Sequence, residues 1–268
     1  MSWGGGDFGG GLASRRAPVY GVVIVSQLVG MVLAATLAIL RGESFPVGAD
    51  LVVSIVAGFA GAIGITALYR GLSIGRMGIV APVTGVLAAV IPVVAGIALQ
   101  GMPAPIVMVG VVLAIVAVIL VSRVADEGGG RAGLTEALVA GVAIGSFGVT
   151  ISFLGDGGVF AALTVIRLTQ AVLVVGFILA IRAAWRPPRS LAPTLLVVGI
   201  LDMGGNGFFL LAVQSGQLAV AAVLSSLYPV TTVVLAALLL HERVTRDHTI
   251  GIVLAGIAIA LIGAGSAA

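Results

Sequence analysis

Apolar runs long enough to cross a lipid bilayer follow one another along almost the whole chain. A membrane-spanning helix needs about 17–25 mainly apolar residues. Nine segments meet that length: residues 18–40, 49–69, 78–99, 104–122, 133–154, 158–181, 192–213, 218–240 and 249–265. Their residues do not alternate between apolar and polar, as the strands of a membrane β-barrel would. The pattern therefore predicts an all-α polytopic membrane protein in which nine complete spans are visible.

The composition supports a membrane protein and excludes several kinds of site. Of the 268 residues, 60% are hydrophobic and only 9% are charged, whereas a soluble domain carries about 25% charged residues. The absence of cysteine excludes disulfides and cysteine-ligated metals. The net charge of +3 comes from arginines scattered between the apolar runs, so we expect them to set the membrane topology. No nucleic-acid partner, metal or cofactor is expected.

The two halves of the chain resemble one another at an offset of 141 residues. Residues 71–122 align with residues 212–263 without a gap, and the identities include the glycine pair Gly75 and Gly216. The offset moves the third span onto the eighth, a step of five spans. Because five is an odd number, one half is inverted relative to the other. Transporters commonly use this plan, with the substrate bound near the membrane midplane between the halves.

The repeat also predicts the domain boundaries and gives a role to the first residues. It divides the chain into a first repeat, 1–125, a linker, 126–132, and a second repeat, 133–268. At the same offset, residues 3–13 align with residues 144–154, which end a predicted span. The glycine-rich opening is therefore interpreted as the last turns of a first helix that is largely missing, because most of it would lie before the first residue.

Four stretches resemble sequences of the EamA family in the drug/metabolite transporter superfamily. The stretch LLLHERVT (238–245) resembles the LLGERVT-like end of that family's penultimate helix. SSLYPVTTVVLAALLL (225–240) resembles the helix before it, and ALYRGLSIGRMGIVAP (67–82) resembles the corresponding part of the first half. SWGGGDF (2–8) resembles the end of the family's first helix. The resemblance implies ten helices in two inverted five-helix repeats, and the export or exchange of small metabolites.

The arginines give one orientation and the resemblance gives another. Eleven arginines lie on one face of the nine-span topology: Arg15, Arg16, Arg70, Arg76, Arg123, Arg131, Arg182, Arg186, Arg189, Arg243 and Arg246. The positive-inside rule makes this face cytoplasmic and places Ala268 outside. The resemblance instead implies cytoplasmic termini for a ten-helix protein. In either orientation we expect a multi-pass protein of the cell membrane, the inner membrane of a bacterium.

Two charged residues lie deep inside predicted spans, where charges are rare and usually functional. Arg167 and Asp202 belong to neighbouring antiparallel spans, at about 14 and 16 Å from the same membrane face if each residue rises 1.5 Å. They are therefore predicted to pair. In one interpretation Arg167 binds an anionic group such as a carboxylate, and Asp202 holds Arg167 or carries a coupling proton. In the other, the two residues form a structural ion pair that orients two helices.

Further polar residues and prolines are weaker candidates. Asn206 lies in the run GGNG (204–207), which either loosens a helix and exposes its carbonyl groups or allows close helix packing. Tyr69 lies near a span end, where anchoring at the interface is its ordinary role. The candidates to line a polar pathway are Gln27, Gln170, Tyr69 and Tyr228. The candidate hinges, which could equally be static kinks, are Pro82, Pro92 and Pro229.

These features predict a secondary transporter that moves a small organic solute by alternating access, as an exporter or an exchanger. No Walker motif is present, so ATP is not expected to drive it. The alternative is a non-transporting helical membrane subunit or a membrane-embedded enzyme. An enzyme would place several acids, bases or metal ligands at one depth, and only one Arg–Asp pair is found. The expected partners are the substrate, the lipid bilayer and coupling protons.

Overall fold

Every regular element in the described part of the chain is a helix. The structure is a computed structural model that describes residues 2–100, 104–124, 132–155, 157–214, 228–240 and 246–265. The helices are α1 Ser2–Ser14, α2 Val19–Leu40, α3 Gly48–Ile74, α4 Met77–Gln100, α5 Pro105–Val124, α6 Leu134–Ile151, α7 Val159–Ile181, the 3-10 helix η1 Arg189–Leu191, α8 Ala192–Gln214, α10 Tyr228–Leu240 and α11 Arg246–Gly265. The predicted all-α class is confirmed.

Two short breaks depend on glycine to reverse the chain. After α2, Gly42 has a φ angle of +64°, which residues with a side chain rarely adopt. Before α6, Gly133 has a φ angle of +82°, and a Cβ there would lie 2.7 Å from the carbonyl oxygen of Gly71. Glycine at these positions therefore lets successive helices run in opposite directions without a steric clash.

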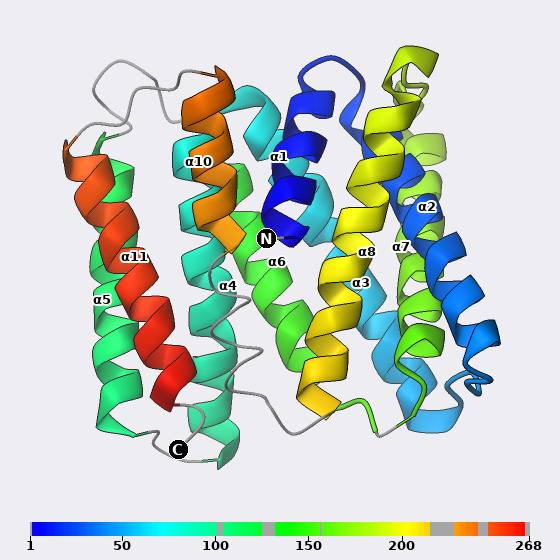
Figure 1. The fold of residues 1–268 in the computed structure, drawn as a ribbon, viewed down its shortest axis with the longest axis horizontal. Coiled ribbons are helices and arrows are strands. Elements are labelled where there is room, and N and C mark those ends of the chain that lie inside the picture. The colour runs from blue at the N-terminus through cyan, green and yellow to red at the C-terminus, as the bar shows by residue number, and fades with distance from the viewer. Residues whose placement is uncertain are drawn as a thin grey trace.

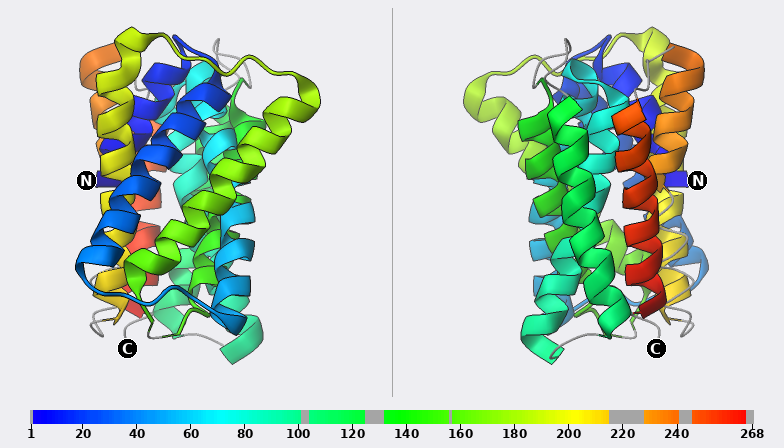
Figure 2. Two further views of the ribbon diagram at one scale, coloured as in Figure 1. Left: turned by 90° about the vertical axis from the view of Figure 1, so that its right-hand side faces the viewer. Right: turned by 90° about the vertical axis from the view of Figure 1, so that its left-hand side faces the viewer.

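The helices form one bundle with a packed pair at each end (Figure 1). At one end α5 packs against α11, and at the other α2 packs against α7. Both pairs also lie side by side when the bundle is seen from its ends (Figure 2). Between them, α3 packs on α6 and α7, α4 packs on α6 and α10, and α8 packs on α1 and α2. The centre of the bundle is therefore built from α1, α3, α6 and α8.

Most predicted spans are helices of the expected length and composition. Five segments are long and apolar enough to cross a membrane: Val19–Leu40, Gly48–Ile74, Leu134–Ile151, Val159–Ile181 and Arg189–Leu211. The predicted spans 78–99, 104–122 and 249–265 are also helical. The first part of span 218–240 lies outside the described residues. Large apolar side chains point outward from the long helices, with 72% of Leu179 and 61% of Val172 exposed, as expected for contact with lipid.

Helix α1 begins about halfway along the length of its neighbouring helices, rather than level with their ends (Figure 1). Its glycines let it pack closely on two longer helices. A Cβ on Gly10 would lie 2.2 Å from the ring of Tyr69 on α3, and one on Gly9 would lie 2.8 Å from Val198 on α8. Arg15 follows α1 and donates hydrogen bonds to two carbonyl oxygens at the end of α3. The opening residues are thus helical, as predicted, and they are packed into the core.

Candidate functional site

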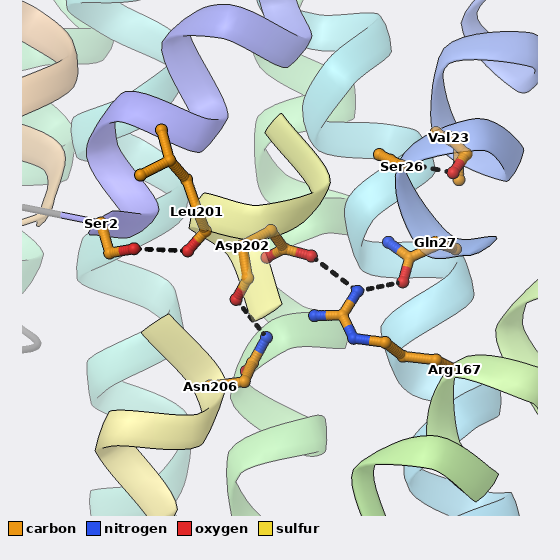
Figure 3. A network of polar contacts seen from close by, with 8 residues as sticks. All are labelled: Ser2, Val23, Ser26, Gln27, Arg167, Leu201, Asp202 and Asn206. Carbon is orange, nitrogen blue, oxygen red and sulfur yellow. Dashed lines mark hydrogen bonds and ion pairs between the residues drawn. The ribbon is translucent and has the colours of Figure 1, made fainter. Parts of the chain in front are cut away.

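A guanidinium group lies in the core of the bundle where three helices meet. Arg167, toward the middle of α7, has only 2% of its surface exposed. Its Nη1 donates to Oδ2 of Asp202 on α8 at 2.9 Å, and to Oε1 of Gln27 on α2 at 2.6 Å (Figure 3). The Arg167–Asp202 pair predicted from membrane depth therefore forms. Gln27, which the sequence marked only as a lining residue, is the third member of the network.

The guanidinium of Arg167 keeps a hydrogen-bond donor that nothing in the described residues uses. Its Nε is buried and has no hydrogen-bond partner. Gln27 is 1% exposed and the side chain of Asp202 is 13% exposed, so the network is shielded from solvent. A guanidinium presents five N–H donors in a planar fork that suits a carboxylate. The Nε–H of Arg167 is therefore available to donate a hydrogen bond to a further anionic group.

A second carboxyl group, that of Asp7 on α1, lies beside this network. Asp7 is 6% exposed, and it is close enough to Asp202 for the two negative charges to repel. The preceding residue, Gly6, packs against the backbone of α8 at Asp202, where a Cβ would lie 3.5 Å from the backbone nitrogen, an ordinary contact distance. The sequence prediction missed Asp7 because it considered charges only in complete spans. The alignment of residues 3–13 with a span end was the signal, since it makes Asp7 a charge inside the membrane.

Tyr69 on α3 lies near the same charged groups and also packs against α1. It is fully buried, at 0% exposure, and it lies within electrostatic range of Asp7, Asp202 and Arg167. The alternative role, an anchor in contact with the lipid–water interface, does not fit, because the ring is fully buried and packs against Gly10 of α1. The ring therefore belongs to the core of the bundle.

The hydroxyl of Tyr69 also has no hydrogen-bond partner among the described residues. It lies beside the side chain of Ser26, but no hydrogen bond joins the two, and Ser26 donates to the carbonyl oxygen of Val23 instead. A buried hydroxyl normally has a partner, because leaving one unpaired is unfavourable by about 1–3 kcal/mol. Tyr69 thus adds an unused polar group to the site.

Asn206 forms a hydrogen bond within its own helix. Its Nδ2 donates to the carbonyl oxygen of Asp202, one turn earlier, at 3.0 Å. Helix α8 is continuous from Ala192 to Gln214, so the first of the two interpretations of the GGNG run, a loosened helix, does not apply. The alternative of close packing fits instead, because a Cβ on Gly205 would lie 2.4 Å from the ring of Trp3 on α1. These glycines therefore bring α1 and α8 together beside the site.

Gln170 lies one turn beyond Arg167 on α7 and is also buried. It is 7% exposed, its Oε1 has no hydrogen-bond partner, and its amide packs against Gly61 of α3. The structure therefore places Gln170 close to the Arg167 network without bonding it to that network.

Within the described residues, no three His, Cys, Asp or Glu side chains gather as metal ligands.

The predicted hinges and Tyr228 lie on other helices. Pro82 and Pro92 are inside α4, which the structure describes as one helix. Pro229 is the second residue of the described part of α10. The side chain of Tyr228 falls outside the described residues.

Comparison with known proteins assigns the chain to a family. The EamA-like transporter family matches residues 131–264, half of the chain. The chain belongs to the EamA-like transporter family. Members of the EamA-like family are transporters rather than enzymes, so the buried network lies in an integral multi-pass membrane protein that acts on a small molecule.

Solved structures share the fold of this chain. Thirteen chains match. One is described only as "Crystal structure of protein"; it has a TM-score of 0.60 and 15% sequence identity, over 97% of this chain and 94% of that chain. At this identity the likeness shows a shared fold alone. No curated protein matches the chain.

Proposed function

We propose that this EamA-like protein is a secondary transporter that moves a small organic metabolite across the inner membrane of a bacterium by alternating access. The observation that carries the proposal is the buried network of Arg167, Asp202 and Gln27. Charged groups inside a membrane are costly and mark substrate or ion pathways. Export or exchange is the mode that the resemblance in the sequence implies.

Helix boundaries support two inverted repeats. Helices α5 and α11 each contain 20 residues, and they begin and end 141 residues apart, which is the offset found in the sequence. Helices α2 and α7 correspond at the same offset to within one residue. The members of each pair pack against one another and run in opposite directions (Figure 1). We take residues 1–125 and 133–268 as the repeats and 126–132 as the linker.

The contacts between helices are also consistent with the proposed repeat. If the repeats are exchanged, the contact of α3 with α7 becomes that of α8 with α2, and the contact of α3 with α6 becomes that of α8 with α1. All four contacts are present. The network therefore joins Gln27 of the first repeat to two residues of the second, at the boundary that alternating access would open.

An anionic group is the substrate feature that the site fits best. The unused Nε of Arg167 can donate to a carboxylate, which would compete with Asp202 for the guanidinium. Gln170 and Tyr69 add buried polar groups without partners close to it. We propose that they contact polar atoms of the substrate, that Asn206 and Tyr228 line the pathway, and that Pro82, Pro92 and Pro229 are its hinges.

The test measures uptake into proteoliposomes for a panel of amino acids and other small carboxylates. We expect Arg167→Ala to abolish transport, while the exposed Arg70→Ala serves as the control and keeps it. Arg167→Ala should also destabilise the fold by about 3–5 kcal/mol, because it leaves Asp202 buried without its partner.

The double variant Arg167→Ala with Asp202→Asn separates a transport site from a structural ion pair. It removes both charges, so much of the lost stability should return. If the pair only orients two helices, transport should return with stability. A double variant that is stable and still inactive supports the substrate site, and one that transports normally contradicts it.

A further inference from the structure

We propose that Asp7 is a proton-binding site, whose carboxyl is a neutral acid while the Arg167–Asp202 pair is closed and exchanges its proton with water when the site opens. The first observation that supports this proposal is that the buried cluster contains more acidic groups than basic groups. Asp7, Asp202 and Arg167 bring two carboxyl groups and one guanidinium into the core. With every group ionised, the cluster would hold a net negative charge inside the membrane, which is strongly unfavourable.

Asp7, rather than Asp202, is the carboxyl that carries the proton. Asp202 accepts a charge-assisted hydrogen bond from Arg167 at 2.9 Å, which stabilises its ionised form. Among the described residues, no cation or hydrogen-bond donor pairs with the Asp7 carboxyl, although 94% of the residue is buried. Burial and repulsion from the Asp202 carboxylate both disfavour a negative charge on Asp7.

Within the described residues, the helices that pack on α1 place no positive charge beside Asp7, since Arg70 of α3 is 58% exposed and pairs with Glu136. Helix α8 contributes Asp202, and α3 contributes the neutral Tyr69. Helix α10 contributes Thr232, which donates to a backbone carbonyl of α1 at Gly4. Helix α2 presents Ser26 and Gln27 near the cluster, and both are neutral. Arg167 on α7 is the positive group among these described neighbours, and it is already paired with Asp202.

The proton step follows the opening of the site. Water that reaches Asp7 solvates its carboxylate, so the O–H bond breaks, its electron pair stays on the carboxylate oxygen and the proton passes to water. Closure returns one proton from water to Asp7, because the closed cluster holds one positive charge for two carboxyl groups. Closure is therefore linked to proton uptake and is disfavoured at alkaline pH.

Infrared spectroscopy of the purified protein in lipid tests the proton site without any transport measurement. At neutral pH we expect the carbonyl band of one buried carboxylic acid, which Asp7→Asn removes. Asp50→Asn is the control and leaves the band, because this carboxyl lies at the start of α3 and accepts a hydrogen bond from the backbone N–H of Gly155. A band that survives Asp7→Asn overturns the proposal.

A second variant gives a result that a merely structural role of Asp7 would not produce. Asp202→Asn removes the carboxylate that repels an ionised Asp7 and leaves the positive charge of Arg167 without a carboxylate partner, so the acid band should also disappear in this variant while Asp7 is intact. A band that persists overturns the proposal. If the wild type lacks the band and its spectrum changes when Na⁺ replaces K⁺, Asp7 holds a metal cation instead, and the proposal is wrong.

Transport measurements test the link to closure, and this part rests on the proposed function. Flux through the wild type should fall as the pH is raised on both sides of the membrane. Asparagine mimics the neutral acid, so Asp7→Asn should lose this fall when each rate is normalised to its own value at neutral pH. An unchanged profile overturns the link. Absence of flux for every substrate would refute the transporter, while the infrared result would still decide the proton site.

Discussion

The contact between Gly10 of α1 and the ring of Tyr69 predicts a large effect from a single methyl group. In Gly10→Ala the added Cβ would lie 2.2 Å from Cζ of Tyr69 and 2.5 and 2.6 Å from its two Cε atoms. Carbon atoms pack favourably at about 3.5–4.0 Å, so the ring and α1 must separate by about 1 Å or more. Tyr69 is completely buried and cannot swing into open space.

The size of the effect follows from two opposing contributions. Overpacking a core destabilises a protein by about 1–3 kcal/mol, whereas replacing glycine by alanine inside a helix stabilises it by about 0.5–1 kcal/mol. The midpoints of these two ranges give a net loss of about 1 kcal/mol. For a chain of this size, that loss lowers the melting temperature by roughly 2–4 °C.

Thermal unfolding of the purified protein, followed by tryptophan fluorescence, measures this loss. Gly176→Ala on α7 is the matched control, because nothing lies within 4 Å of the added Cβ. It should leave the melting temperature unchanged or slightly raised. Adding Tyr69→Leu to Gly10→Ala should lower the melting temperature by less than the sum of the two single effects. A melting temperature of Gly10→Ala at or above that of the wild type would refute the packing of α1 on Tyr69.

Three further substitutions probe contacts at the ends of the helices. Glu43→Ala removes the carboxylate that accepts hydrogen bonds from the backbone N–H groups of Phe160 and Ala161, the second and third residues of α7. It should cost about 1–2 kcal/mol in unfolding free energy and speed hydrogen exchange in that turn; unchanged exchange would count against the cap. Arg70→Ala breaks the ion pair with Glu136, but the arginine side chain is 58% exposed, so its stability should change by less than about 1 kcal/mol; a larger loss in thermal unfolding would contradict this. Gly21→Ala places a Cβ 1.9 Å from the backbone oxygen of Trp185. Its melting temperature should therefore fall further than that of Gly10→Ala. A smaller fall would show that the segment around Trp185 moves to make room for the methyl group.

The length of the apolar runs was enough to predict most helices and one contact between them. Helix α7, Val159–Ile181, begins and ends within one residue of the predicted span 158–181. The rise per residue is fixed by the helical backbone, so positions along two antiparallel spans convert directly into depth. This reasoning brought Arg167 and Asp202 to similar depths, and their charged atoms are 2.9 Å apart.

Hydropathy could not predict where a helix continues beyond its apolar part. The predicted span ends at Tyr69 because Arg70 follows, yet the hydrogen bonds of α3 do not depend on side-chain hydropathy and extend to Ile74. The Arg70 side chain remains 58% exposed and pairs with Glu136. Tyr69 therefore lies inside the helix and the core rather than at the interface.

Glycine runs were ambiguous for a different physical reason. Glycine lowers the intrinsic stability of a helix, but it also allows two helices to approach closely, and tertiary contacts decide between these effects. In α8, the Trp3 ring packs directly over Gly205, and the helix stays intact. In α1 the glycines likewise allow close packing, on Tyr69 and on Val198, in the helix that carries Asp7.

The proposed repeat explains the scaffold but not the distribution of charge within it. The 141-residue offset pairs Arg167 with Ser26 and Asp202 with Gly61, so the ion pair has no counterpart in the first half. That half instead provides space for the polar side chains of the second.

Two glycines of the first half provide this space. A Cβ on Gly30 would lie 2.8 Å from Nη1 of Arg167, and one on Gly61 would lie 2.0 Å from Nε2 of Gln170. A second, symmetrical ion pair would fill this space and bury two more charges, which the membrane core strongly disfavours. The repeated helices can therefore supply the symmetry that alternating access needs. The proposed substrate site is therefore asymmetric: the second half contributes the Arg167–Asp202 pair, and the first half contributes Gln27, Asp7 and the space over its two glycines.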